Sequence, residues 1–483
     1  MNVTYQHYIN GEWVPSDHND TIDVINPATE EVISTIPSGT KEETEKAVAA
    51  ADAAFDSWAA TPVADRAVYL MKIADKLEEK KDHFIKTLTE ENGKTMDTSE
   101  AELTVAIDYF RYMAGWARKY EGEILESDRP NENIMVFKKP IGVVGGIIPW
   151  NFPVFILARK VAPALLTGCT IVIKPGQATP NTAGEFAKLI HELDLPKGVF
   201  NIVHGKGSTV GNTLASHPKM GMISMTGSFN AGSAVMEAAA KGITKVNLEL
   251  GGKAPAIVSK HADVDLAVEN VYASRTINNG QACTNAERVY VHEDVAEEFT
   301  RKITEKMKNA KVGNSMNEKN IDVGPLVNQD QIDSVSAMVD NAVKAGAKVE
   351  TGGSRKDSDK GFFYQPTVLT AVKQDMEIIQ EEIFGPVLPI MTYKNFDDAI
   401  KMANDTVFGL SSSIFSENIH EIMRAANELK FGETFVNREN FEAIQGFHAG
   451  RKQSGLGGAD GKHGLEEHLE THVVYMQYKN DIN

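Results

Sequence analysis

The sequence predicts an α/β protein with two open, mainly parallel sheets. Two observations carry this prediction. The chain has 483 residues, which exceeds what one ordinary hydrophobic core organises and favours two or three domains. From about residue 140 onward, short β-branched runs alternate with helical patterns, and such alternation is typical of parallel βαβ units.

The region before residue 121 predicts a hairpin followed by a helix. In YINGEWV at 8–14, Asn10-Gly11 lies between apolar flanks, and this pair suits a type I′ turn. Thr40 and Glu43 have the spacing of a capping box at the start of a helix over 41–58, whose alanines mark the buried side.

Two series of strands follow. The first comprises GVVGGII, TIVIKP, GVFNIVHG and KMGMISMTG, and the second lies at 254–259, 286–292, 365–372 and 411–416. The segment 122–139 predicts a hairpin that interrupts the first series, and 471–481 predicts an alternating strand without a partner nearby in sequence. Exposed edge strands of this kind pair with another subunit or need a cover.

Composition excludes several functions. Lys and Arg number 49 against 67 Asp and Glu, and the formal net charge of −18 opposes binding to nucleic acid or to an anionic membrane. We find no apolar run of membrane-spanning length and no signal-peptide pattern. Two cysteines cannot build a disulfide framework. We therefore expect a cytoplasmic protein that binds a small molecule.

Two glycine-rich turns favour a dinucleotide. Gly205, Gly207 and Gly211 follow a predicted strand, one residue off the G-x-G-x-x-G fingerprint. The turn MTGSFNAG at 225–232 also joins a strand to a helix, and Ser228 could bind a phosphate or cap that helix. Either turn alone is often only a tight connection, but two in one domain favour a cofactor.

Three polar residues could carry chemistry. Cys283 follows the turn NNGQ, so we expect it where a helix ends, and its thiolate would be a strong nucleophile. Glu249 ends a strand between leucines, where apolar surroundings favour the acid form and suit a general base. Asn151, in PWNFP, could donate to an oxyanion.

Each residue also has a plainer interpretation. Cys283 could be a spare buried cysteine, Glu249 a strand-end carboxylate bonded to amides, and Asn151 a turn residue. Cys169 lies in an apolar run and is expected to be structural. His468 and His472 have the i,i+4 spacing of a metal pair, but no third ligand is apparent. We therefore predict no metal site and a solvated segment there.

Together these stretches resemble the NAD(P)-dependent aldehyde dehydrogenase superfamily. The matches run in family order across nearly the whole chain: PWNFP at 149–153, IVIKPG at 171–176, MTGS at 225–228, LELGGK at 248–253, GQAC at 280–283 and EEIFGPV at 381–387. The resemblance implies an aldehyde dehydrogenase-like fold, with a Rossmann-type cofactor domain at 1–121 and 140–251. It further implies a second α/β catalytic domain at 252–465 and a small β oligomerisation arm at 122–139 and 466–483, and hence a homodimer or homotetramer.

By position, the resemblance makes Cys283 the nucleophile, Glu249 the base and Asn151 the side-chain donor of an oxyanion hole. It implies an NAD site formed by Lys174 and Gln177 at the adenine ribose, Glu382 at the nicotinamide ribose, and Trp150, Gly207, Gly227, Ser228 and Phe384. The implied reaction oxidises an aldehyde to the carboxylic acid through a thiohemiacetal and a thioester.

Gln177 departs from the pattern of the family. Many NAD-preferring members carry a Glu at this position, whereas this chain reads KPGQ. A neutral amide keeps hydrogen bonding to the ribose but does not repel a 2′-phosphate. We therefore predict NAD use with NADP also accepted.

The substrate prediction depends on the region 437–464, which resembles a loop of the lactaldehyde and glycolaldehyde dehydrogenase subgroup, as do 118–134 and 157–168. If Arg159, Glu442 and His448 face the substrate tunnel, they offer donors and acceptors to a hydroxyl beside the aldehyde. The alternative is that all three are surface or salt-bridged residues.

Other functions stay open. A semialdehyde or betaine aldehyde dehydrogenase of the same superfamily would share the chemistry. A cofactor-independent Cys acyl-transferase or hydrolase would need a His partner, and none lies near Cys283 in sequence. A binding relative without activity would not need the three catalytic residues together.

Overall fold

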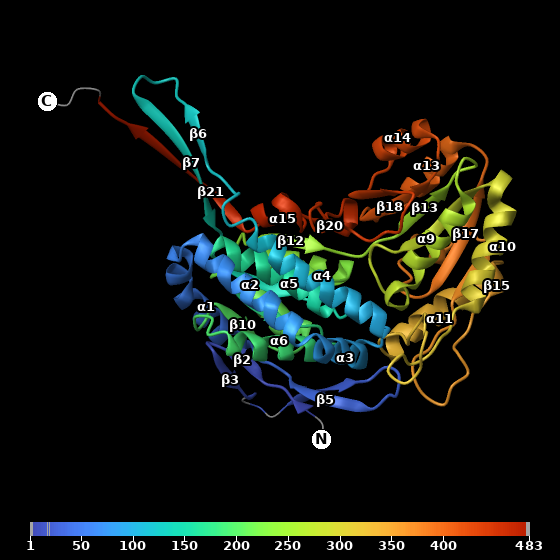
Figure 1. Cartoon of the computed structure of the whole chain (residues 1–483), viewed down its shortest axis with the longest axis horizontal. Helices are drawn as coiled ribbons and strands as arrows, with labels where there is room; N and C mark the ends of the chain where they lie inside the picture. The colour runs from blue at the N-terminus through green and yellow to red at the C-terminus, as the bar shows by residue number, and fades with distance from the viewer. Residues whose placement is uncertain (1–2, 17, 19, 480–483) are drawn as a thin grey trace.

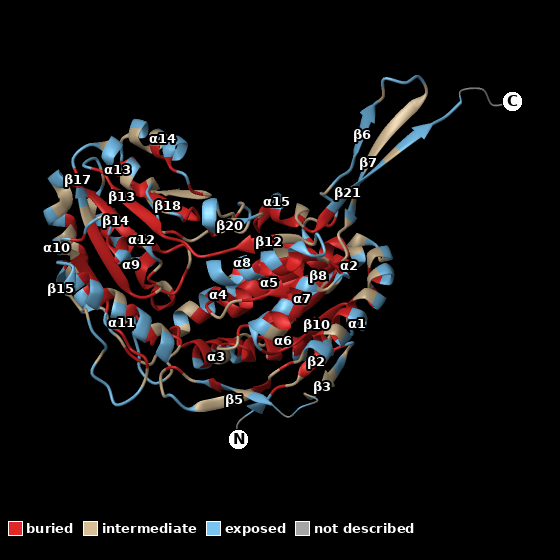
Figure 2. Ribbon diagram, turned by 180° about the vertical axis from the view of Figure 1, so that it is seen from behind, coloured by how far each residue is buried: buried red, intermediate tan, exposed pale blue. Residues whose placement is uncertain are grey.

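The computed structural model describes residues 3–16, 18 and 20–479. Two α/β lobes lie side by side, and a β-arm projects from the first (Figure 1). In both lobes the sheets are buried between helices, whereas the arm is largely exposed (Figure 2). No helix in the described part of the chain is long and apolar enough to cross a membrane.

The first lobe contains an eight-stranded sheet. Its order is β20 (Gly455–Leu456), β12 (Lys245–Glu249), β11 (Met220–Thr226), β8 (Val143–Ile147), β9 (Thr170–Lys174), β10 (Phe200–Ile202), β2 (His7–Ile9) and β3 (Glu12–Val14). The strands from β12 to β10 are parallel, and the edges are antiparallel. Every residue of β8 and β9 is buried, as expected for parallel strands covered on both faces.

Local signals in the first lobe behave as predicted. Asn10 and Gly11 have positive φ values of 53° and 76° in the β2–β3 turn, and the Thr40–Glu43 capping box starts α1. The helices are α1 (Lys41–Ala60), α2 (Val63–Glu79), α3 (Lys81–Asn92), α4 (Met96–Ala114), α5 (Pro153–Thr167), α6 (Asn181–Glu192), α7 (Asn212–Ser216) and α8 (Phe229–Ala240). The turn at Gly207–Gly211 is π-helical.

The second lobe contains a seven-stranded sheet. Its order is β15 (Lys348–Thr351), β16 (Thr367–Thr370), β17 (Val387–Tyr393), β14 (Ala286–His292), β13 (Ala254–Val258), β18 (Ser411–Phe415) and β19 (Glu433–Val436), parallel except at β15. Its helices are α9 (Val264–Thr276), α10 (Glu293–Asn309), α11 (Gln329–Lys344), α12 (Glu377–Gln380), α13 (Phe396–Asn404) and α14 (Ile419–Glu428), with 3₁₀ turns at Ile277–Gly280 and Lys452–Ser454. The second predicted strand series is confirmed.

The arm is a three-stranded antiparallel sheet of β6 (Glu123–Glu126), β7 (Glu132–Pro140) and β21 (Leu469–Gln477). The predicted hairpin and the last strand therefore pair with each other. Residues 480–483, which the predicted arm includes, lie outside the described residues. Apolar side chains exposed on the arm include Ile124, Leu125, Phe137, Val473, Tyr475 and Met476.

Two features differ from expectation. The sheet of β1 (Val3–Thr4), β5 (Val32–Pro37) and β4 (Thr21–Ile25) was not predicted, because these strands are short and give a weak apolar pattern. The segment 463–472 is not simply solvated. It contains the end of α15 (Gly461–Glu466), and Leu465 and His468 are buried. The prediction that Cys169 is a buried thiol is confirmed, and its Sγ lies 3.4 Å from the His468 carbonyl.

Candidate active site

The predicted catalytic and cofactor residues line one continuous cleft. A cavity of about 250 Å³ contains Asn151, Glu249 and Cys283, together with Glu382 and Phe384. A cavity of about 600 Å³ contains Lys174, Gln177 and Gly207. The two share five lining residues: Pro149, Trp150, Thr226, Gly227 and Ser228. Sequence-distant motifs thus line a single elongated site.

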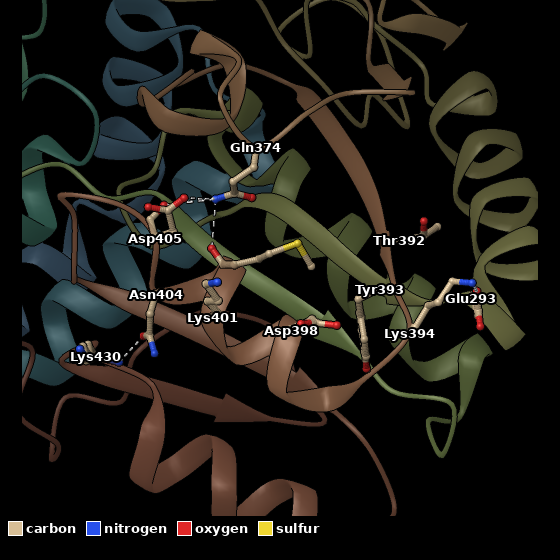
Figure 3. A pocket seen from close by; sticks show the side chains of 11 residues that line it. Glu293, Gln374, Thr392, Tyr393, Lys394, Asp398, Lys401, Asn404, Asp405 and Lys430 are labelled. Carbon is tan, nitrogen blue, oxygen red and sulfur yellow. Dashed lines mark hydrogen bonds and ion pairs between the residues drawn. The ribbon is translucent and has the colours of Figure 1, made fainter.

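A larger hollow of about 840 Å³ lies in the second lobe and shares no lining residue with this cleft (Figure 3). It contains lysines and carboxylates side by side, including Lys401 and Asp405. None of the predicted site residues lines it, so size alone does not identify the site.

Cys283 lies just beyond the 3₁₀ turn that ends α9, as predicted. Asn278 and Asn279 in this turn have left-handed φ values of 48° and 61°, a conformation that asparagine tolerates better than most residues. Asn278 Nδ2 donates to the Asn151 carbonyl at 2.8 Å, which ties the thiol loop to the PWNFP loop. Burial raises the pKa of the Cys283 thiol, and a hydrogen bond with His448 opposes that rise.

His448 is the partner that sequence distance concealed. It is buried, with Nδ1 3.1 Å from Glu433 Oε2. Burial alone would lower its pKa, but Glu433 and Glu442 outweigh burial and, with the Cys283 hydrogen bond, raise the pKa of His448 well above its ordinary value. The two carboxylates therefore favour the cationic form of the imidazole that hydrogen-bonds Cys283.

Replacing His448 with Asn should make Cys283 less reactive at neutral pH. The thiolate is the reactive form. Without the cation, burial and the nearby carboxylates of Glu442 and Glu382 raise the pKa of Cys283 without opposition from His448. Alkylation by iodoacetamide, followed against pH, should shift to higher pH and slow several-fold at pH 7. An unchanged profile would show that His448 does not act on the thiol.

Glu249 corrects one expectation. It was predicted to have its acid form favoured by apolar surroundings. Burial does raise its pKa, but Lys160, Arg159 and other partners outweigh burial and lower the pKa of Glu249 to about 2. Lys160 Nζ lies 3.1 Å from Oε2, and the Thr226 hydroxyl donates to the same oxygen at 2.5 Å. In this conformation the carboxylate is charged and held by Lys160, so it is a weak base.

The other carboxylate oxygen, Glu249 Oε1, is buried and has no hydrogen-bond partner among the described residues. This oxygen can therefore accept a hydrogen bond from a water molecule in the cleft. Movement away from Lys160 would raise the pKa of Glu249 and strengthen it as a base.

The Asn151 loop is fixed by buried polar contacts. Lys94 Nζ donates to the Asn151 carbonyl at 2.7 Å, and Lys94 is also paired with Glu102. Asn151 Nδ2 donates to the Gln281 carbonyl at 3.1 Å. Since an amide group carries two hydrogens, the second can serve an oxyanion in the cleft.

The three candidate substrate residues are buried or nearly so, and they do not line the cleft cavities. Arg159 makes a bidentate pair with Asp460, at 3.0 and 2.8 Å, and a 2.8 Å contact with Glu442. Arg159 and Glu442 therefore form a buried salt bridge with each other, and Arg159 forms another with Asp460. Glu442 and Asp460, the two carboxylates paired with Arg159, lie within the electrostatic surroundings of His448, which contacts Cys283.

Lys160, Glu433 and Asp460 were missed by sequence reasoning. A signal existed only for Lys160: it stands beside Arg159 within FILARKVAPALL, an otherwise apolar helix that is buried throughout. Two adjacent charges in such a helix require buried partners.

The residues that line the cavity of about 600 Å³ suit a nucleotide. Burial lowers the pKa of Lys174 to about 8, and no acceptor among the described residues bonds its ammonium, which leaves it available to ribose hydroxyls. Space is open in front of Gly207. Ser228 caps α8 through the Ala231 amide at 3.3 Å, so its capping role is the one observed.

At the other end of the cleft, Glu382 Oε1 accepts from the Gly252 amide at 2.8 Å. Burial, with Glu287 nearby, raises the pKa of Glu382 to about 8. The Trp150 and Phe384 rings stand nearly perpendicular, with centroids 5.4 Å apart. Within the described part of the chain, no group of three or more His, Cys, Asp or Glu residues could hold a metal ion.

Comparison with known proteins gives the family. The aldehyde dehydrogenase family model matches residues 13–474. Lactaldehyde dehydrogenase of Escherichia coli (strain K12) is 52% identical over 99% of this chain and 100% of its own. The crystal structure of lactaldehyde dehydrogenase from Escherichia coli has a TM-score of 0.98 at 51% identity, with the same coverage.

Two more distant relatives differ in their ligands. Betaine aldehyde dehydrogenase of Staphylococcus aureus, in complex with NAD+, has a TM-score of 0.96 at 36% identity and covers 99% of this chain and 96% of its own. D-glyceraldehyde dehydrogenase (NADP(+)) of Picrophilus torridus is 38% identical over 98% of this chain and 96% of its own. The chain belongs to the aldehyde dehydrogenase family. The expected fold is confirmed, and the protein is an oxidoreductase.

Proposed function

We propose that this enzyme oxidises a small 2-hydroxyaldehyde, such as lactaldehyde or glycolaldehyde, to the carboxylic acid with NAD. The observation that supports the substrate class is the contact of His448 with Cys283, with the Glu442 carboxylate, held by Arg159, in the surroundings of both. A tunnel for fatty or aromatic aldehydes would be mainly apolar, whereas this cluster offers charged donors and acceptors. The similarity to lactaldehyde dehydrogenase supports the same class.

The mechanism assigns one task to each catalytic residue. The Cys283 thiolate attacks the aldehyde carbon, and the Asn151 amide with the Cys283 backbone amide stabilises the alkoxide of the thiohemiacetal. Lys174 and Glu382 would hold NAD, which would supply the hydride acceptor for oxidation of the thiohemiacetal to the thioester. Glu249, released from Lys160, takes a proton from the water that hydrolyses the thioester.

Glu442→Gln tests the substrate class. A site that hydrogen-bonds a hydroxyl loses much of its preference when a polar partner is removed, so kcat/KM for lactaldehyde should fall about tenfold or more. Propanal lacks only the 2-hydroxyl and serves as the matched substrate. Any effect of Glu442 on Cys283 and His448 changes both aldehydes alike, so the ratio of kcat/KM for lactaldehyde to that for propanal should fall. An equal loss for both aldehydes would show that Glu442 does not recognise the hydroxyl.

Cofactor choice follows from Gln177, which lines the nucleotide cavity. Its neutral side chain does not repel a 2′-phosphate, so we infer that NADP is accepted beside NAD. Asp23 and Asp330 also line this cavity and oppose a phosphate there, which keeps NAD preferred. The NADP-dependent relative supports such tolerance within the family.

We infer a homodimer or homotetramer from the arm. Ile124 is 74% and Tyr475 67% exposed, and a long apolar sheet exposed in this way needs a cover. Sedimentation equilibrium should give a mass of two or four chains, and deletion of 122–139 should lower it. A monomeric mass for the intact protein would refute this inference.

The domain division at 1–121 with 140–251, 252–465, and 122–139 with 466–483 remains part of the proposal. The two sheets support it. However, β20 pairs with β12 of the first sheet, so the segment near 455 crosses back to the cofactor lobe. Cys169 and Cys283 are both free thiols, which supports a cytoplasmic location.

The Cys283–His448 contact favours one second candidate, hydrolysis of esters or thioesters without a cofactor. That reaction needs no nucleotide and gives the cavity that contains Lys174 and Gln177 no function. A semialdehyde or betaine aldehyde substrate keeps the chemistry and differs only in the contacts beyond the aldehyde carbon.

A further inference from the structure

Three segments that carry site residues meet backbone to backbone in the second lobe. Gly252 follows the Glu249 segment, and a Cβ there would lie 2.3 Å from the Cys283 carbonyl oxygen. Gly280 has a φ of 81°, and a Cβ there would lie 2.2 Å from the carbonyl carbon of Gly385. Side chains at these positions would force the base, thiol and cofactor loops apart.

Three fully buried charged side chains bind these segments together: Lys253, Arg275 and Glu287, here called the charged junction. Glu287 Oε2 lies 2.9 Å from Lys253 Nζ, and Oε1 lies 2.8 Å from Arg275 Nη1. Burial raises the pKa of Glu287, but the two cations outweigh burial and lower the pKa to about 2. The carboxylate is therefore charged at any physiological pH.

The junction reaches directly into the cofactor loop. The Ile383 and Phe384 amides donate to the two oxygens of Glu287 at 2.9 and 3.2 Å. Arg275 donates to the carbonyls of Gly280, at 2.7 Å, and Gly385. One cation thus bridges the turn before Cys283 and the loop after Glu382.

Phe384 shows why this loop needs an anchor. Its φ of 54° is a left-handed conformation that is costly for a bulky residue and persists only where the surroundings impose it. The ring nevertheless stands against Trp150 at the Cys283 end of the cleft. A carboxylate that accepts from both the Ile383 and Phe384 amides supplies the constraint.

We propose that Glu287 is a positioning residue for hydride transfer: held between Arg275 and Lys253, it fixes the 382–385 loop so that Glu382 and Phe384 meet the nicotinamide end of the cofactor. The proposal rests on the proposed function, because that loop is taken to contact NAD. Neither Glu287 nor Arg275 belongs to the motifs that carry the family resemblance.

Glu287→Gln tests the proposal with little change in shape. Charge-assisted hydrogen bonds to the two amides are weakened, so the Kd of NAD, measured by calorimetry, should rise about tenfold. The isotope effect on kcat with 1-deuterated lactaldehyde should increase, because a misplaced loop slows hydride transfer. Alkylation of Cys283 by iodoacetamide in the cofactor-free protein should stay nearly unchanged, since Arg275 still bonds Gly280.

Arg288→Lys is the matched control. Arg288 is the next residue on β14 and equally buried; its Nε donates to the Lys253 carbonyl at 3.1 Å, and its other donors bond the Tyr290 hydroxyl and the Ala403 carbonyl. Arg288 therefore touches the Lys253 backbone but bonds no residue of the 382–385 loop among the described residues. This variant should lower the Tm without changing the Kd of NAD. Equal weakening of NAD binding in both variants, or none in Glu287→Gln, would overturn the proposal.

A second variant, Glu287→Asp, tests the same proposal if Glu287→Gln does not fold. Glu287→Asp keeps the charge between the cations but is too short to reach both amides, so it should give the same changes in Kd and isotope effect. Wild-type values for Glu287→Asp would likewise overturn the proposal. If the wild-type protein itself neither binds nor reduces NAD, the proposed function fails instead.

Discussion

Cys283→Ala should abolish aldehyde oxidation while leaving NAD binding intact. Without the thiol no thiohemiacetal forms, and loss of a catalytic nucleophile typically lowers kcat by about 10⁴ to 10⁶. The cofactor residues Lys174 and Glu382 belong to other segments, so the Kd of NAD should stay near that of the wild type. Initial rates with lactaldehyde and calorimetry with NAD give the two numbers.

The matched control is Cys169→Ala, because Cys169 is the second thiol of the chain and is fully buried away from the cleft. It should keep near-normal kcat. Substantial dehydrogenase activity in Cys283→Ala would refute the covalent mechanism, and loss of activity in both variants would point to general destabilisation.

Glu249→Gln should stop the reaction after one turnover. The amide keeps the shape and the Thr226 contact but cannot take a proton from water, and general base catalysis contributes about 10²–10⁴ in rate. Acylation of Cys283 does not need this base, so a stopped-flow trace should show a burst of NADH equal to the active sites, followed by a slow phase. Mass spectrometry should find the acyl group on Cys283.

Lys160→Met removes the cation that holds the Glu249 carboxylate. Loss of the cation leaves Glu249 free to move and raises its pKa, so the hydrolysis step should not show the stall seen with Glu249→Gln. A linear trace without a burst in Glu249→Gln would contradict the assignment of Glu249 to thioester hydrolysis.

Features set by local sequence were predictable. The β2–β3 turn depends on Asn10-Gly11, the start of α1 depends on Thr40 and Glu43, and both appear as expected. The motifs PWNFP, LELGGK and GQAC end strands or turns, and chain topology then brings them to one cleft. Family resemblance supplied the order of these motifs, which composition alone could not.

Features set by long-range electrostatics were not predictable. Glu249 stands between leucines in sequence, yet Lys160 from α5 decides its protonation. His448 lies far along the chain from Cys283, and only the tertiary fold makes them partners. Glu287 is one of many strand residues until its two buried cations are seen.

The most direct test of the proposed function is initial-rate reduction of NAD and, separately, NADP, with lactaldehyde, glycolaldehyde, succinic semialdehyde, betaine aldehyde and hexanal. We predict that kcat/KM is highest for the two hydroxyaldehydes with NAD, and that NADP is used measurably. A higher kcat/KM for hexanal, succinic semialdehyde or betaine aldehyde would contradict the hydroxyaldehyde site, and no reduction with any of the five would contradict the dehydrogenase mechanism itself.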